Sequence, residues 1–246
     1  MVRVQSHARF PIWLPGFVAA LLASALSGPL GARDFADSLV KVRAVAADGS
    51  VSSGSAVVIA TNLLATACHV TREAKTIEVT HRDQRWGATV ESGSMTHDLC
   101  LVSVPNLDLP PVAIRGSASL QVGERVIAAG FAGGGDLAVR DGIVEGLYAY
   151  DGGQVIRTSA TFDAGASGGG LFDAEGALVG LLAFRARSGA KLHFALPADW
   201  ALPGSMVSSL LGPVAISTQR SAFWERPRAS QPPFLGHAML EAASQR

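Results

Sequence analysis

The feature of this sequence that most limits its fold is a series of short, strand-like segments separated by turn residues. Residues 39–45 alternate between charged and apolar side chains, which is the period of a half-buried β-strand. Further strand-like segments are residues 55–60, 63–67, 76–81, 86–91, 99–104, 125–129, 137–150, 154–160, 169–172, 177–184 and 192–196. Short strands with glycine-rich turns predict an all-β barrel or sandwich.

The segments fall into two sets, which predict two lobes. The first set covers residues 38–105 and the second covers residues 124–197. Residues 106–123 contain adjacent prolines and a Gly-Ser pair, and are typical of a linker. A short helix is expected within residues 197–211. The remaining residues, 213–246, gain prolines, arginines and serines and lose periodicity, so they are predicted to form a flexible tail.

The first 32 residues have the layout of a secretory signal peptide. Basic residues precede an uncharged apolar run at residues 12–26, and small residues follow. Prolines interrupt this run, which is shorter than the roughly 20 residues that span a bilayer. We therefore expect residues 1–32 to be cleaved and the protein to be exported, periplasmic or secreted, with no stable membrane span; an uncleaved anchor is the alternative.

Charge and glycine content argue against two other classes of protein. The chain has 20 basic and 20 acidic residues without a block of one sign, so no nucleic-acid partner is expected. Residues 130–135 are glycine-rich but match no Walker pattern and precede no expected helix, so they are interpreted as a loop. No cofactor is predicted.

Chemistry-bearing residues occur in three separate motifs. Ser167 lies among small residues at 163–172, where Gly165 lets the backbone approach a substrate carbonyl. The amides of Gly165 and Ser167 are candidates to hold the charge that develops on an attacked oxygen. Upstream, His69 and Asp98 supply a base and an acid that orients it. The order along the chain is His, Asp, Ser.

Together these motifs resemble those of the trypsin-like (chymotrypsin-fold) serine proteases, closest to the bacterial periplasmic Deg, or high-temperature-requirement, branch. Residues 54–59, 126–146 and 193–197 also resemble family segments, and the likeness covers roughly residues 38–211. It implies two six-stranded antiparallel β-barrels with the active site in the cleft between them. The protease domain is expected at residues 38–212, without the PDZ domain of the Deg proteases.

The resemblance implies a serine endopeptidase acting on polypeptides. Ser167 attacks the peptide carbonyl, His69 takes its proton, and Asp98 orients the imidazole, giving an acyl-enzyme that water hydrolyses. Because the imidazole must be neutral to act as a base, activity is expected to fade below about pH 6.5.

The resemblance also implies a specificity pocket. At one position, Ala166, the sequence departs from the family pattern. The expected pocket walls carry no acid, which predicts a preference for small or medium apolar side chains; these walls are Thr161, Phe162, Ala183, Phe184 and Phe194. Ala166 replaces the polar residue that precedes the nucleophile in the family. We therefore expect no activation by a released N-terminus. The sequence does not decide which conformation the oxyanion loop adopts at rest.

Two cysteines flank the proposed triad. Cys68 and Cys100 adjoin residues that must approach each other, so a disulfide is one interpretation for an exported protein. Two buried thiols are the other. Adjacent Cys-His does not match zinc-ligand spacing, and no metal site is predicted.

Two alternative functions remain open from the sequence. Residues 165–169 satisfy the G-x-S-x-G pattern of α/β-hydrolase esterases, for which Asp199 and His237 would complete a triad. The glycines that follow Ser167 are poor material for the helix that fold requires. A non-catalytic binding module on a protease scaffold is the second alternative.

Overall fold

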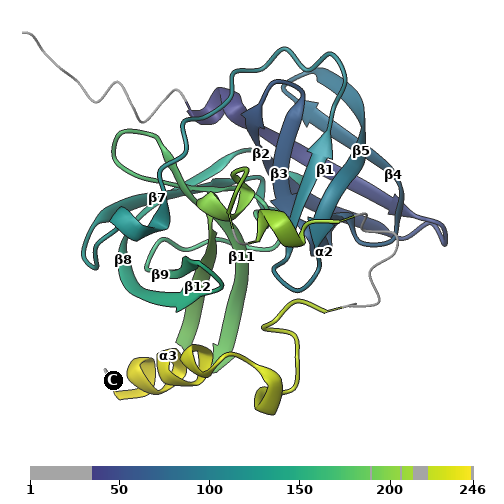
Figure 1. Ribbon diagram of the computed structural model, residues 1–246. Helices are drawn as coiled ribbons and strands as arrows, with labels where there is room; N and C mark the ends of the chain where they lie inside the picture. The colour runs from purple at the N-terminus through teal and green to yellow at the C-terminus, as the bar shows by residue number, and fades with distance from the viewer. Residues whose placement is uncertain (1–34, 189, 206, 213–220, 245–246) are drawn as a thin grey trace, which may run out of the picture.

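Two closed antiparallel β-barrels form the body of the protein (Figure 1). The computed structural model describes residues 35–188, 190–205, 207–212 and 221–244. The predicted signal peptide, residues 1–32, lies outside the described residues.

The first barrel contains six strands in the order β1-β2-β3-β6-β5-β4. These strands are β1 (Leu39–Ala46), β2 (Val51–Ala60), β3 (Leu63–Ala67), β4 (Ala74–His81), β5 (Gln84–Ser94) and β6 (Leu99–Ser103). Asn62 turns the chain between β2 and β3 with a φ of 59°, a conformation that Asn adopts more readily than most residues. Val40, Val58 and Val79 are among the fully buried side chains that fill this barrel.

The second barrel repeats the six-strand arrangement, in the order β10-β11-β12-β9-β8-β7. Its strands are β7 (Arg125–Gly130), β8 (Ala138–Tyr150), β9 (Gly153–Thr158), β10 (Gly170–Phe172), β11 (Leu178–Ser188) and β12 (Ala190–Pro197). Gly142 lets β8 pass close to the end of β9, because a Cβ there would lie 2.2 Å from the backbone nitrogen of Ala160. Val144, Ile156 and Leu171 belong to the fully buried core.

The fold class predicted from the sequence is confirmed: both barrels are present, and each has six strands. β3 has the predicted bounds, whereas β2 begins four residues before its predicted start, at Val51. Val51 is followed by two serines, and all three residues are exposed. No alternation of apolar and polar side chains therefore marks this part of the strand in the sequence. Pairing with β1 nevertheless extends the strand, since Val45 pairs with Val51.

The short C-terminal helix of the predicted fold is present, but it lies beyond the expected stretch, residues 197–211. Two single turns of 3₁₀-helix, η4 (Ala198–Ala201) and η5 (Ser208–Leu210), occupy that stretch. The C-terminal α-helix is instead α3 (Pro233–Ser244), beneath the second barrel in Figure 1. Gly204, at a φ of 82°, interrupts the expected helix because this conformation is not helical.

The expectation of a flexible tail is corrected for residues 221–244. Phe223 is fully buried, with its ring centroid 4.9 Å from that of Tyr150 and 6.0 Å from that of Phe234. Leu235 is buried in the same cluster. A few aromatic anchors without helical or strand period hold this segment, which is why composition alone suggested disorder.

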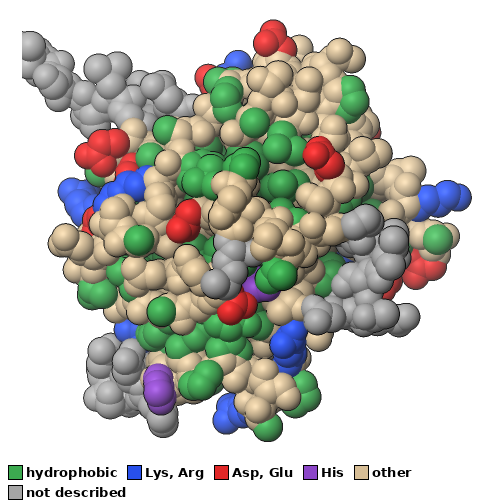
Figure 2. Space-filling model, in the orientation of Figure 1, with side chains coloured by type: hydrophobic (Ala, Val, Ile, Leu, Met, Phe, Trp, Pro, Cys, Tyr) green, Lys and Arg blue, Asp and Glu red, His purple; other side chains and the backbone are tan. Residues whose placement is uncertain are grey.

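On the face shown in Figure 2, acidic and basic side chains lie among apolar and uncharged groups, without a large patch of one sign. Within the ranges that the structure describes, no helix has the length and apolar character needed to cross a bilayer.

Candidate active site

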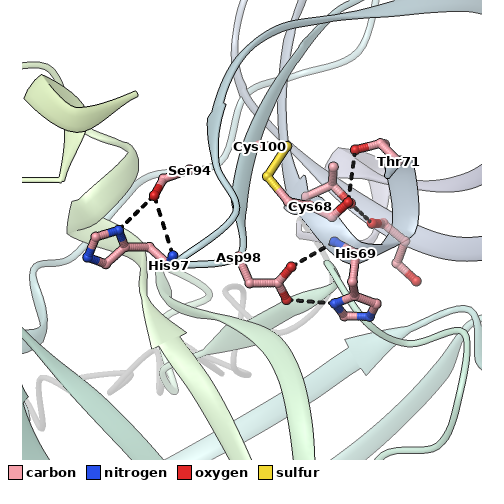
Figure 3. Close-up of a disulfide and its surroundings, with 9 residues drawn as sticks. Cys68, His69, Thr71, Ser94, His97, Asp98 and Cys100 are labelled. Carbon is pink, nitrogen blue, oxygen red and sulfur yellow. Dashed lines mark hydrogen bonds and ion pairs between the residues drawn. A yellow bond between two sulfur atoms is a disulfide. The ribbon is translucent and has the colours of Figure 1, made fainter. Parts of the chain in front are cut away.

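His69 and Asp98 form a closely bonded pair at one end of the first barrel (Figure 3). His69 lies in the single helical turn α2 (Cys68–Thr71), which follows β3 directly. Asp98 immediately precedes β6, the strand that pairs with β3. One carboxylate oxygen of Asp98 lies 2.6 Å from Nδ1 of His69, and the other accepts the His69 backbone N–H at 2.7 Å. The imidazole is therefore held by its Nδ1 edge, and Nε2 is the nitrogen left for chemistry.

The turn that carries Asp98 is constrained by backbone geometry and by a covalent bond. Asp98 has a φ of 53°, a left-handed conformation that most residues avoid. Its backbone oxygen accepts the N–H of Cys68 at 3.1 Å. The structure joins Cys68 and Cys100 by a disulfide, with a Cα–Cα distance of 4.9 Å. Of the two interpretations left open by the sequence, the structure has the bridge.

Electrostatics favour proton uptake by the imidazole. Burial lowers the pKa of His69, but the charge and hydrogen bond of Asp98 raise it by more, so the net pKa lies above its usual value. The charge of Glu225 also raises the pKa of His69, and that of Arg72 lowers it. Burial raises the pKa of Asp98, whose oxygens have no exposed surface, and the contacts with His69 only partly offset this.

Ser167 lies in a loop of the second barrel that needs two glycines. Gly165 and Gly168 have φ values of 93° and 81°, in the left-handed region that favours glycine. A Cβ at Gly165 would lie 2.6 Å from the nitrogen of Gly133. A Cβ at Gly168 would lie 2.3 Å from Oγ1 of Thr66 and 2.9 Å from the nitrogen of Ala67 on β3. The loop can therefore press against the strand that leads into His69 because Gly168 lacks a side chain, and against the loop that contains Gly133 because Gly165 does.

The backbone amides of Gly165 and Ser167, on either side of Ala166, differ from the Ala166 amide in their hydrogen bonding. The Ala166 N–H donates to Asp163 at 3.0 Å. Among the hydrogen bonds of the described residues, none uses the N–H of Gly165 or that of Ser167 as its donor. Two unpaired backbone donors, one from the serine itself and one from the residue two positions before it, are the arrangement that holds an oxyanion.

Hydrogen bonds to carbonyl oxygens fix the orientation of one of these amides. The Gly133 N–H donates to the Ala164 oxygen at 2.7 Å. The peptide bonds of the described residues are trans, so the Gly165 N–H points away from that carbonyl. The next carbonyl, that of Gly165, accepts the hydroxyl of Ser55 at 2.9 Å. The carbonyl oxygens of Ala164 and Gly165 are therefore both held by hydrogen bonds from neighbouring segments.

Ser55, on β2 of the first barrel, connects the two halves of the site. Its hydroxyl donates to Gly165 and accepts the N–H of Phe131 at 2.8 Å. Its backbone N–H donates to the oxygen of Ser167 at 2.8 Å, and its own oxygen accepts the hydroxyl of Thr66 at 2.7 Å. All the hydrogen-bonding groups of this fully buried residue are therefore engaged.

The Ser167 hydroxyl donates to the Ala183 oxygen at 3.3 Å. In the part of the chain that the structure describes, no hydrogen bond joins it to His69. A change of the serine χ1 rotamer reorients the hydroxyl without moving the backbone. Such contacts are commonly long or absent before a substrate binds.

Ala166, where the sequence departs from the family, is buried in the core of the second barrel. Its oxygen accepts the Gly169 N–H at 2.8 Å. A Cβ at Gly130 would lie 3.0 Å from the Ala166 side chain, so these two small residues pack closely. Ala166 is therefore enclosed by apolar packing, in which a charged side chain at this position would need a partner.

The residues predicted to line a specificity pocket take different positions. Ala183 adjoins Ser167 through its carbonyl, and Phe184 follows it on β11. Phe194 has no exposed surface and stacks behind Phe184, with ring centroids 4.8 Å apart. Phe162 is buried edge-on against His193, and its neighbour Thr161 is exposed.

His97, Ser94 and Asp151 form a second polar cluster, which the sequence did not predict. His97 is 3% exposed, and its Nδ1 lies 2.8 Å from the hydroxyl of Ser94. Its Nε2 lies 2.7 Å from a carboxylate oxygen of Asp151, in the turn between β8 and β9. The contact joins the loop before Asp98 to the second barrel. Only the position of His97 beside Asp98 signalled a role, because Asp151 is remote in sequence.

The site has no arrangement suited to the esterase alternative. An α/β-hydrolase needs strands alternating with helices, and both sheets here are closed antiparallel barrels. Asp199 contacts the Ser117 N–H and hydroxyl, both at 3.3 Å, and His237 is exposed on α3. Across the described ranges, no group of three or more His, Cys, Asp or Glu residues is placed to hold a metal ion.

Two antiparallel six-stranded barrels, with a His–Asp pair on one and a glycine-bounded serine on the other, define the architecture of trypsin-like hydrolases. The model of the trypsin-like peptidase domain matches residues 54–181, and the chain belongs to this family.

Curated relatives include longer proteases of the Deg/HtrA group. Protease Do-like 1, chloroplastic, from Arabidopsis thaliana is 34% identical over 145 residues, covering 53% of this chain and 33% of that protein. Serine protease Rv3671c from Mycobacterium tuberculosis is 28% identical over 173 residues, covering 65% of this chain and 43% of that protein. The chain thus spans less than half the length of these relatives.

Solved structures share the fold. The HtrA-type protease AlgW with tripeptide is 27% identical, with a TM-score of 0.63, and the match covers 68% of this chain and 58% of that one. The active form of the Rv3671c protease is 23% identical, with a TM-score of 0.66, and covers 90% of this chain and 99% of that one. The second likeness concerns the fold alone.

Proposed function

We propose that this protein is a serine endopeptidase in which Ser167 is the nucleophile and His69 is the general base. The observation that carries the proposal is the pair of unpaired amides at Gly165 and Ser167 on the second barrel, together with the hydrogen-bonded His69–Asp98 pair on the first. Family membership and the serine protease relatives support the same reaction class.

The reaction follows from the positions of these groups. As the Ser167 oxygen bonds to the peptide carbonyl carbon, its proton passes to Nε2 of His69. The carbonyl oxygen becomes negative and accepts the amides of Gly165 and Ser167. Asp98 keeps the other imidazole nitrogen protonated and stabilises the imidazolium. His69 then protonates the leaving amine, and water releases the acyl group by the same steps.

The substrates are proposed to be polypeptides, and the compartment an exported one. The leader-like residues 1–32 support export. The Cys68–Cys100 bridge supports an oxidising compartment, where disulfides persist. A preference for apolar substrate side chains stays a prediction, supported by the apolar character of Ala183 and Phe184.

Labelling with a fluorophosphonate serine-hydrolase probe tests the proposal. We expect stoichiometric labelling of the purified protein, loss of labelling in the Ser167→Ala variant, and retention in a Ser94→Ala control. Hydrolysis of a casein-derived peptide pool, monitored by mass spectrometry, should follow the same pattern. Absence of labelling in folded protein would contradict the proposal.

One observation favours the alternative of a binding module without catalysis. The Ser167 hydroxyl is directed to Ala183 instead of His69. If that contact is permanent, the serine is not activated. Peptide binding without labelling or cleavage would identify such a module.

A further inference from the structure

The C-terminal strap, residues 221–226, contacts the segments that carry His69 and Asp98, and also Phe184, which follows the Ala183 whose carbonyl accepts the Ser167 hydroxyl. The Phe223 N–H donates to the Thr96 oxygen at 2.9 Å, and Thr96 lies two residues before Asp98. Glu225 pairs with Arg72 at 3.5 Å, three residues after His69. Trp224 stacks on Phe184, with ring centroids 4.3 Å apart and an interplanar angle of 11°. These segments are otherwise distant in sequence.

Several contacts hold the strap in place. The Phe223 ring is fully buried against Phe184, 5.9 Å between centroids, and against rings of the second barrel and α3. The side-chain amide of Gln231 donates to the oxygens of Trp224 and Arg226, each at 2.8 Å. Arg226 donates to the hydroxyl of Thr96 at 3.0 Å. A strap anchored at both ends presents Trp224 in a fixed orientation.

The strap lies beside the reacting groups without engaging them. In the described part of the chain, no hydrogen bond joins the strap to Ser167, Gly165 or Ala183. The His69 side chain is 27% exposed. Trp224 is only partly buried, so it keeps exposed surface while it stacks on Phe184. The strap therefore lies at the side of the reacting groups and does not cover them.

We propose that the strap forms one wall of the substrate site and that Trp224 is a specificity-determining residue. The Trp224 ring would contact an apolar side chain of the polypeptide at one position near the scissile bond. An indole supported by a stacked phenylalanine offers a rigid apolar surface, which favours aromatic and branched aliphatic groups over charged ones. This inference rests on the proposed endopeptidase function.

The test compares peptide preference in variants of the full protein. Positional-scanning fluorogenic libraries should show a preference for Phe and Leu over Ser and Glu at one position. In Trp224→Ala, kcat/KM for the preferred peptides should fall about tenfold relative to peptides with Ser at that position. Trp224→Phe should restore most of the preference. Trp86→Ala, at the far end of β5 from Ser94, is the matched tryptophan control and should leave the profile unchanged.

Three outcomes would overturn the inference. The first is an unchanged peptide profile in Trp224→Ala. The second is a uniform increase in hydrolysis of all peptides in that variant, which would show that the strap obstructs the site. The third is failure of the wild-type protein to react with the fluorophosphonate probe, which would overturn the endopeptidase function itself. Only the third removes the proposed function, so the two failures are distinguishable.

Discussion

The two halves of the candidate active site are stabilised by different means. The His69–Asp98 half is fixed within the first barrel, by paired strands, two hydrogen bonds that the Asp98 carboxylate accepts from His69, and the Cys68–Cys100 disulfide. The Ser167 half obtains its shape from outside its own loop, through Ser55 of the first barrel and Gly133 of the neighbouring loop.

This difference separates stability from catalytic geometry. The first half should be less sensitive to the contact between the barrels, because the bonds that join His69 to Asp98 lie within the first barrel and the Cys68–Cys100 link beside them is covalent. The second half depends on the contact between the barrels, so small changes at that contact should impair catalysis before they unfold the protein. Four predictions test this contrast.

Asp98→Asn should give the largest effect. An asparagine cannot accept both hydrogen bonds and stabilises the wrong imidazole tautomer, so kcat should fall about 10⁴-fold. Steady-state hydrolysis of a fluorogenic peptide measures this change, with circular dichroism as the check on folding. Loss of less than tenfold would show that Asp98 does not orient the base.

Replacing both Cys68 and Cys100 by Ala should reduce stability. Removal of the bridge should lower the free energy of unfolding by about 3 kcal/mol, since the unfolded chain gains freedom. Urea titration followed by tryptophan fluorescence measures the change, and addition of reductant to the wild-type protein should reproduce it. Equal stability with and without reductant would contradict a structural disulfide.

Ser55→Ala should impair the Ser167 half selectively. Loss of the hydroxyl frees the Gly165 carbonyl and leaves the Phe131 N–H unpaired, so the oxyanion amides lose their alignment. We expect kcat to fall about 10- to 100-fold, with a smaller change in KM. Ser52→Ala, on the exposed part of the same strand, is the matched control. Unchanged kcat would show that Gly133 alone suffices.

Glu225→Gln should give the smallest effect, which is a shift in the pH dependence of kcat/KM. The charge of Glu225 raises the pKa of His69, and the base must be neutral to act. With Asp98 and Arg72 unchanged, removal of this charge lowers the pKa, so the acid limb of kcat/KM should move to lower pH. Glu78→Gln on β4, an exposed carboxylate paired with Arg85, is the control. A shift to higher pH would contradict the proposed electrostatics.

The raised pKa of His69 also corrects the pH dependence expected from the sequence. A reference histidine predicts loss of activity below about pH 6.5. In the folded protein, Asp98 and Glu225 favour the protonated imidazole despite its burial. Activity should therefore begin to decline at a higher pH than a reference histidine predicts.

Most of the fold was predictable because strand formation depends on local pattern. Residues 39–45 alternate between charged and apolar side chains and residues 63–67 are mostly apolar, and the structure places strands at both. The tail was not predictable, because the burial of Phe223 requires rings from β8 and β11. Likewise, the partner of His97 is Asp151, 54 residues away, and no local pattern connects them.

The sequence by itself determined the strand pattern, the three motifs and their order, and the glycines that permit left-handed backbone at 165 and 168. These are properties of neighbouring residues and of side-chain chemistry. Tertiary structure alone decided which amides stay unpaired, which carbonyls are held, and where the strap lies. Those outcomes depend on contacts such as Ser55–Gly165, 110 residues apart, which exist only once both barrels have closed and met.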